Sequence, residues 1–167
     1  MRLRVVICLL FTVALAIIPS STYEQTSQQA TSLVALNYYP KVAVGSMTTI
    51  SFDVTYSTSK RVWLMTVLGC EPKKSDCSSV SIEGISSSPF PCNSTDPFGH
   101  QGPLILGTCY LTITTSGVDF FTYNLSFGKA GTYELTASSQ LNYPGDLNSI
   151  PGSRSTNETM TITVTGP

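Results

Sequence analysis

Apolar and polar residues alternate along residues 47–56, which read MTTISFDVTY. One face of this segment carries Ile50, Phe52, Val54 and Tyr56, and the other carries Thr49, Ser51, Asp53 and Thr55. A period of two over this length predicts a half-buried strand of an antiparallel sheet.

Seven further segments have the length and composition of β-strands, and no credible helix pattern occurs among them. They are residues 42–44, 61–68, 79–85, 104–115, 119–127, 131–137 and 158–165. Short strands separated by turn residues predict an all-β protein, either a sandwich or a barrel. We favour the sandwich.

Two aromatic positions resemble the immunoglobulin-like plan of such a sandwich. Trp63 falls on the third predicted strand, and the triplet Gly131-Thr132-Tyr133 opens the penultimate one. The two cysteines that antibody domains place on their second and sixth strands are missing. We therefore expect residues 40–167 to form an immunoglobulin-like antiparallel β-sandwich, preceded by a strand-like N-terminal tail.

The N-terminus has the layout of a secretory signal peptide. Arg2 and Arg4 precede an apolar stretch that ends at Ile18, and the polar sequence PSST follows. The stretch is shorter than the roughly 20 apolar residues of a membrane-spanning helix. We expect residues 1–22 to be a signal peptide, cleaved after Ala16 or near Thr22. The mature protein is then secreted, extracellular or at the cell surface, without a membrane anchor; an uncleaved signal acting as a tether is the alternative.

The cysteines that remain after Cys8 leaves with the signal are Cys70, Cys77, Cys92 and Cys109. An even number in an oxidising compartment predicts two disulfides, for which three pairings exist. We favour Cys70–Cys77 and Cys92–Cys109, since each closes a local loop. A zinc site is disfavoured because no pair has the usual ligand spacing of two to four residues.

The inventory of reactive side chains argues against an enzyme. His100 is the only histidine, which excludes a metal site built on several histidines, and no nucleophile-elbow motif lies near it. Lysine plus arginine number 9 and aspartate plus glutamate 10, so no basic patch for nucleic acid is expected. We expect no catalytic residues, no metal and no cofactor.

Three N-glycosylation sequons, at Asn93, Asn124 and Asn157, are a more specific signal. Asn93 falls in a loop rich in serine and proline, Asn157 begins the last predicted strand, and Asn124 falls on the outward face of its strand. Each position is predicted to accept an N-linked glycan without disturbing the core.

The segment SLVALNYY, residues 32–39, has high β-propensity and no charge, and Pro40 separates it from the predicted domain. One interpretation is a split first strand that changes sheets at Pro40. The other is strand donation, in which the tail of residues 23–39 completes the sheet of the next subunit. The donated side chains would be Leu33, Val34, Leu36 and Tyr38. A head-to-tail contact of this type need not close on itself, and it then generates a filament.

The signal peptide, the strand-like tail, the single immunoglobulin-like domain, the sequons and the scarce charge together resemble the thread filament subunits of Sulfolobales-type archaea. The resemblance implies a secreted glycoprotein that forms homo-oligomeric filaments by donor-strand complementation, used in adhesion or biofilm cohesion. It places the donor strand at Leu33 to Tyr39 and the glycans at the three sequons.

The alternative function is a monomeric secreted or cell-surface module that binds a glycan or a protein partner. Its binding surface would be the loop of residues 141–155, with Tyr143, because loops of such sandwiches often carry binding sites.

Overall fold

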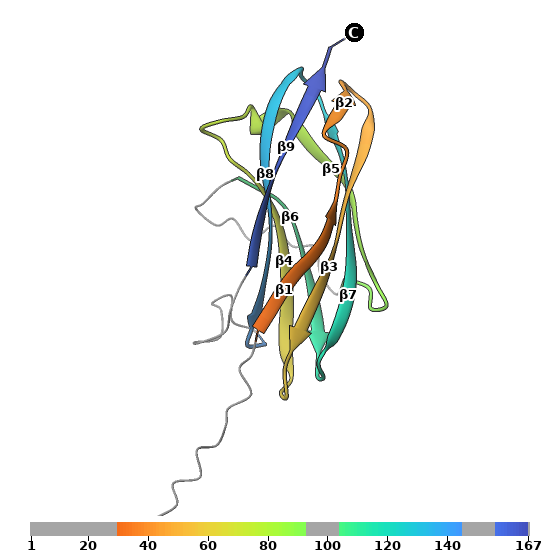
Figure 1. The fold of residues 1–167 in the computed structure, drawn as a ribbon, viewed down its shortest axis with the longest axis vertical. Helices are drawn as coiled ribbons and strands as arrows, with labels where there is room; N and C mark the ends of the chain where they lie inside the picture. Colours follow the sequence, from red (N-terminus) through yellow and green to blue (C-terminus); the bar gives the residue numbers. More distant parts are fainter. Residues whose placement is uncertain (1–29, 93–103, 145–155, 167) are drawn as a thin grey trace, which may run out of the picture.

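The computed structural model describes residues 30–92, 104–144 and 156–166, and this part of the chain contains nine β-strands and one short 3-10 helix (Figure 1). The strands are β1 (Ala30–Asn37), β2 (Lys41–Ala43), β3 (Met47–Ser57), β4 (Val62–Cys70), β5 (Val80–Ser88), β6 (Leu104–Ile113), β7 (Gly117–Phe127), β8 (Gly131–Asn142) and β9 (Thr156–Thr165). The 3-10 helix, η1, is Cys77–Ser79.

The strands form two sheets packed face to face. The four-stranded sheet has the order β1-β3-β7-β5, and the five-stranded sheet has the order β2-β9-β8-β4-β6. The first order is the ABED order of immunoglobulin constant-type domains, and β4, β8 and β9 form the CFG order opposite it. This topology confirms the predicted immunoglobulin-like sandwich. Short β2, parallel to β9, and β6, beside β4, extend the second sheet.

Alternate residues of each strand fill the space between the sheets. Phe52 on β3 stacks between Phe121 and Tyr123 of β7, with ring centroids 5.8 and 5.7 Å away, and all three are fully buried. The Tyr123 hydroxyl lies 2.8 Å from the hydroxyl of Thr66 on β4, so it joins the two layers. Burying each such aromatic or aliphatic side chain contributes about 1.5–3 kcal/mol.

Each of the eight strands predicted from the sequence corresponds to an observed strand. β8 continues past the predicted end at residue 137 to Asn142, and η1 was not predicted. Trp63 lies on β4 as expected, but its side chain is on the outer face, where it forms a T-shaped pair with the Tyr110 ring, with centroids 5.9 Å apart. Antibody domains instead bury their tryptophan between the sheets.

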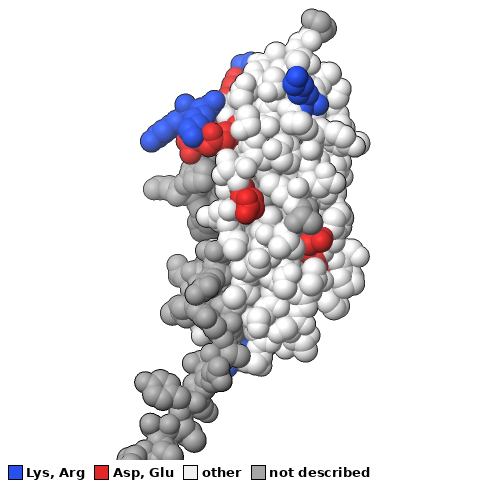
Figure 2. Space-filling model, in the orientation of Figure 1, with Lys and Arg blue, Asp and Glu red and all other residues white. Residues whose placement is uncertain are grey.

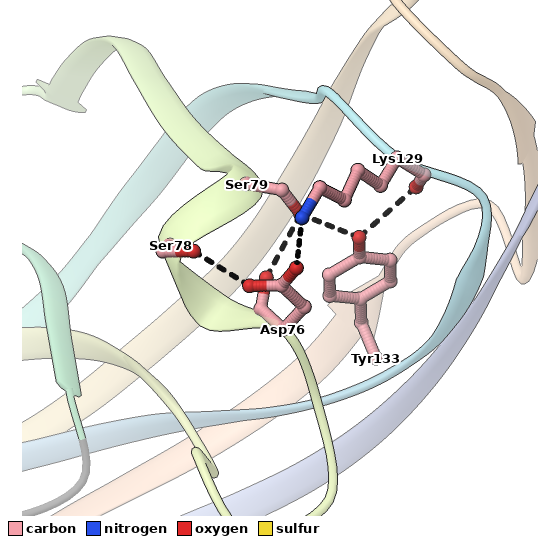
Figure 3. Close-up of polar contacts among 5 residues, drawn as sticks. All are labelled: Asp76, Ser78, Ser79, Lys129 and Tyr133. Carbon is pink, nitrogen blue, oxygen red and sulfur yellow. Dashed lines mark hydrogen bonds and ion pairs between the residues drawn. The ribbon is translucent and has the colours of Figure 1, made fainter.

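The end of the sandwich where β7 turns into β8 is held by a network of hydrogen bonds around Tyr133 (Figure 3). The Tyr133 hydroxyl donates to the backbone oxygen of Lys129 at 3.0 Å, which is the tyrosine corner of immunoglobulin-like folds. The same hydroxyl lies 2.6 Å from that of Ser79, and Lys129 pairs with Asp76 at 2.7 Å. The segment between β4 and β5 is thereby attached to the start of β8.

Both predicted disulfides are present. Cys70 pairs with Cys77, with their Cα atoms 5.8 Å apart, and Cys92 pairs with Cys109 at 5.4 Å. The first closes the segment that Tyr133 helps to hold, and the second ties the residues after β5 to β6. Disulfides of this kind are typical of proteins from oxidising compartments.

Candidate strand-exchange site

β1 forms one edge of the four-stranded sheet by antiparallel pairing with β3 of the same chain. The arrangement is that of a split first strand: β1 belongs to one sheet, and β2 belongs to the other. The chain crosses between the sheets at residues 38–40, where Tyr39 is 67% exposed. At the end of the crossing, the Pro40 backbone oxygen accepts a hydrogen bond from the backbone N–H of Thr163 at 2.8 Å.

Three of the four side chains predicted for a donor strand pack against the core of this chain, and the fourth does not. Leu33 is buried, and Leu36 and Tyr38 pack partly buried against the core. Val34 lies on the outer face and is 44% exposed, so it contributes nothing to the core. Thr31, which is not among the predicted donor residues, is also buried and faces inward.

A bulge explains why Leu33 and Leu36 both point inward although they are three positions apart, an odd spacing that places residues of a regular strand on opposite faces. Val34 pairs with Asp53 and Asn37 pairs with Ser51, so β1 contains one residue more than β3 between these two pairs. An extra residue reverses the alternation of faces in the strand that contains it.

Hydrogen bonds link β1 to β8 and β9 of the five-stranded sheet. The Thr31 hydroxyl donates to the Ser139 backbone oxygen of β8 at 3.1 Å. The Leu33 backbone N–H donates to the Thr156 hydroxyl of β9 at 2.9 Å, and this hydroxyl lies 3.1 Å from that of Ser139. β1 therefore fills the seam between β3 on one sheet and β8 and β9 on the other. Figure 1 shows it running along the sandwich to β2.

The surface around this seam carries little charge. β1 contains no charged residue, and the face seen in Figure 2, in the orientation of Figure 1, shows only a few charged side chains. The ion pairs Lys74–Glu134 and Lys129–Asp76 belong to the end of the sandwich near the first disulfide. Uncharged edges are those that pair most readily with another strand.

A buried carboxylate lies on the inner face of β7. Asp119 is fully buried, and its Oδ2 accepts a hydrogen bond from the Tyr56 hydroxyl at 2.8 Å. Burial raises the pKa of Asp119, whereas the Tyr56 hydroxyl and the backbone of Phe90 act in the opposite direction. Burial and the neighbouring carboxylate likewise raise the pKa of Tyr56.

Two of the predicted sequon asparagines lie in the described structure. Asn124 lies on the outer face of β7, half-buried, and Asn157 lies exposed near the start of β9. Asn93 and most of the loop 141–155 lie outside the described residues; within that loop Tyr143 is 44% exposed. Glycosylation at the three sequons stays a prediction.

The described residues contain no group of three or more histidine, cysteine, aspartate or glutamate side chains that could hold a metal ion. His100 and the predicted signal peptide lie outside them. Across residues 30–92, 104–144 and 156–166, no helix is long and apolar enough to cross a membrane.

Comparison with known proteins gives the fold alone. No protein-family model and no curated protein matches the chain. The cupredoxin domain of amoB from Nitrosocaldus yellowstonii is similar with a TM-score of 0.51 and 10% identity, over 81% of this chain and 87% of that one. The CARDB domain of the PF1109 protein from Pyrococcus furiosus has a TM-score of 0.45 and 10% identity, over 81% and 93%. A PapD-like domain of human CEP192 has a TM-score of 0.43 and 7% identity, over 93% and 97%.

Proposed function

We propose that this protein is a secreted structural subunit of an extracellular filament, assembled head-to-tail by exchange of β1 between neighbouring copies and used in adhesion or biofilm cohesion. The observation that supports the proposal is the way β1 is held. It is an uncharged edge strand that fills the seam between the sheets, and the chain leaves it through the crossing at residues 38–40.

The groove that receives β1 accepts the same strand from a second copy. Its inner contacts come from Val54, Ser139 and Thr156, which belong to β3, β8 and β9. A donated β1 would keep these contacts, which is why exchange of an identical element is a low-cost route to assembly. Because the donated strand and the groove are different surfaces, the contact is head-to-tail, and it continues into a filament unless the rotation closes a ring.

Electron microscopy of native material, combined with an engineered disulfide across the β1–β3 pair, tests the proposal. Ser32 lies directly opposite Thr55, and both are exposed. Opposed residues have Cα atoms about 4.5–5.5 Å apart, which a disulfide can bridge. With Ser32→Cys and Thr55→Cys, filaments built by exchange give a covalent ladder on a denaturing gel without reductant. Filaments that yield only cross-linked monomers would show that assembly does not use β1.

The matched control is the pair Ser51→Cys and Thr122→Cys, which lies opposite on β3 and β7 within the body of the domain. This pair stays within one chain in either arrangement, so it gives monomers. Absence of filaments in native material would refute the proposed function altogether.

The alternative is a monomeric module that binds a glycan or a protein, and the pairing of β1 with β3 of its own chain favours it. The sandwich is then complete without a second copy. Tyr143, exposed just past the end of β8, would belong to the binding surface. Native material that is monomeric and loses saturable binding on Tyr143→Ala would establish this function.

A further inference from the structure

The amide of Asn124 is oriented by its neighbours on both sides of β7. Asn124 lies opposite Thr49 on β3 and opposite Gly84 on β5. The Thr49 hydroxyl donates to the Asn124 Oδ1 at 2.9 Å. A Cβ at position 84 would lie 3.8 Å from Nδ2. Nδ2, the nitrogen to which an N-glycan is attached, therefore lies beside Gly84, which has no side chain.

The strand β5 departs from regular pairing at this point. Its register with β7 shifts between Ile82 and Gly84, which leaves Glu83 outside the regular ladder. The Glu83 carboxylate accepts a hydrogen bond of 2.7 Å from the hydroxyl of Ser126, the third residue of the sequon. The next outward residue of β5, Ser86, is small and exposed, so open space flanks Asn124 on the β5 side.

We propose that Asn124 carries an N-linked glycan, that Gly84 leaves the space for its first sugar, and that the glycan is attached before β7 is enclosed between β3 and β5. The inference is independent of filament formation.

The order of events follows from the pairing of β7. An N-x-[ST] sequon serves as an acceptor where the transferase can reach it, which is why such sequons are expected on surface loops. Asn124 and Ser126 are paired with both β3 and β5, and Leu125 between them is fully buried. The finished sheet offers the enzyme no backbone to bind.

Asn157 provides a control within the same molecule. It is exposed, it lies one residue from the start of β9, and its registered partner is Ser138 on β8 alone. A folded domain can present this sequon without breaking a central strand.

Mass spectrometry of glycopeptides tests whether Asn124 is glycosylated before β7 is enclosed in the sheet. The full chain is produced unglycosylated and folded, then incubated with a purified oligosaccharyltransferase and its lipid-linked oligosaccharide. In the folded chain we expect transfer to Asn157 and no measurable transfer to Asn124. A peptide of residues 119–131 is expected to be modified at Asn124, and native protein is expected to carry a glycan there. An unoccupied Asn124 in native protein, or transfer to the folded domain at the rate of Asn157, would overturn the inference.

The substitution Gly84→Thr tests the space beside the amide. Position 84 does not require a positive φ, so threonine is compatible with the backbone there. We expect this variant to lower the unfolding midpoint of the glycosylated protein, and to leave unchanged or raise that of an Asn124→Gln protein, because threonine favours strands. An equal change in both backgrounds would show that the glycan does not use this space.

Discussion

Replacing Leu33 by alanine tests directly whether β1 is an integral part of the sandwich. Leu33 is 7% exposed and packs on the core, whereas Val34, the next residue of the same strand, is 44% exposed on the outer face. The two substitutions remove apolar atoms from opposite faces of one strand. Their difference therefore isolates packing in the seam from any general loss of strand propensity.

The expected magnitude follows from burial. Leucine-to-alanine changes in cores lower the free energy of unfolding by about 2–5 kcal/mol. Leu33 belongs to an edge strand, where neighbours can relax, so we expect about 2–3 kcal/mol. Val34→Ala removes little buried area and is expected to lower it by less than about 1 kcal/mol, mainly through strand propensity.

Urea denaturation of the two variants and the wild type, followed by circular dichroism with the disulfides intact, measures these differences. Equal destabilisation by the two substitutions would refute the assignment of Leu33 to the core. If filaments form by exchange, Leu33→Ala also weakens the joint between subunits, so its filaments dissociate at lower denaturant concentration than those of Val34→Ala.

Three further substitutions probe the polar contacts. Asp119→Asn is expected to stabilise the domain at pH 7, because the raised pKa of Asp119 in the folded state means that its ionisation opposes folding. The gain shrinks as pH falls through that raised pKa and is gone below the ordinary value of about 3.9, which melting curves at several pH values would show. Tyr133→Phe removes the tyrosine-corner hydroxyl and should lower the free energy of unfolding by about 1–3 kcal/mol in urea titrations; no change would mean that the network adds nothing. Thr156→Val leaves the Leu33 N–H without its acceptor and should lower the free energy of unfolding by about 1–2 kcal/mol, with Thr161→Val, exposed on the same strand, as a near-neutral control.

Where apolar residues alternate with a clear period of two, the sequence predicts both the strand and the face that points to the core. Where that alternation is lost, it predicts the strand but not the face. In β3 the apolar residues occupy one face, so strand and orientation were both correct. In β4 both faces carry apolar residues, including Leu64 inside and Trp63 outside, and alternation alone does not say which face is the core. The β-sandwich class was expected from the number and length of the predicted strands, without their order in the sheets. The disulfide pairing that was favoured among three possibilities, because each bond closes a local loop, is the one observed.

The inward face of β1 was not predictable for a specific reason. The bulge between Val34 and Asn37 reverses the alternation, so a pattern read at constant period cannot place Leu33 and Leu36 together. Thr31 is buried because its hydroxyl has a backbone partner on β8, a contact between residues 108 positions apart that local sequence does not show. The space at Gly84 likewise depends on a neighbour across the sheet.

If β1 is exchanged between chains as proposed, we expect the choice between pairing within and between chains to be made before the domain closes. Both arrangements make the same contacts, but within one chain a short linker gives β1 an effective concentration in the millimolar range, so a folded chain in dilute solution is expected to keep its own strand. Exchange then requires that neighbours meet while β3 is still unpaired. The proposed glycan at Asn124 requires that β7, the next strand of the same sheet, is also open during modification. The two proposals place their decisive steps in the same interval, before the sheet closes. Filaments that grow from purified, folded and unglycosylated chains would show that the two steps are separate.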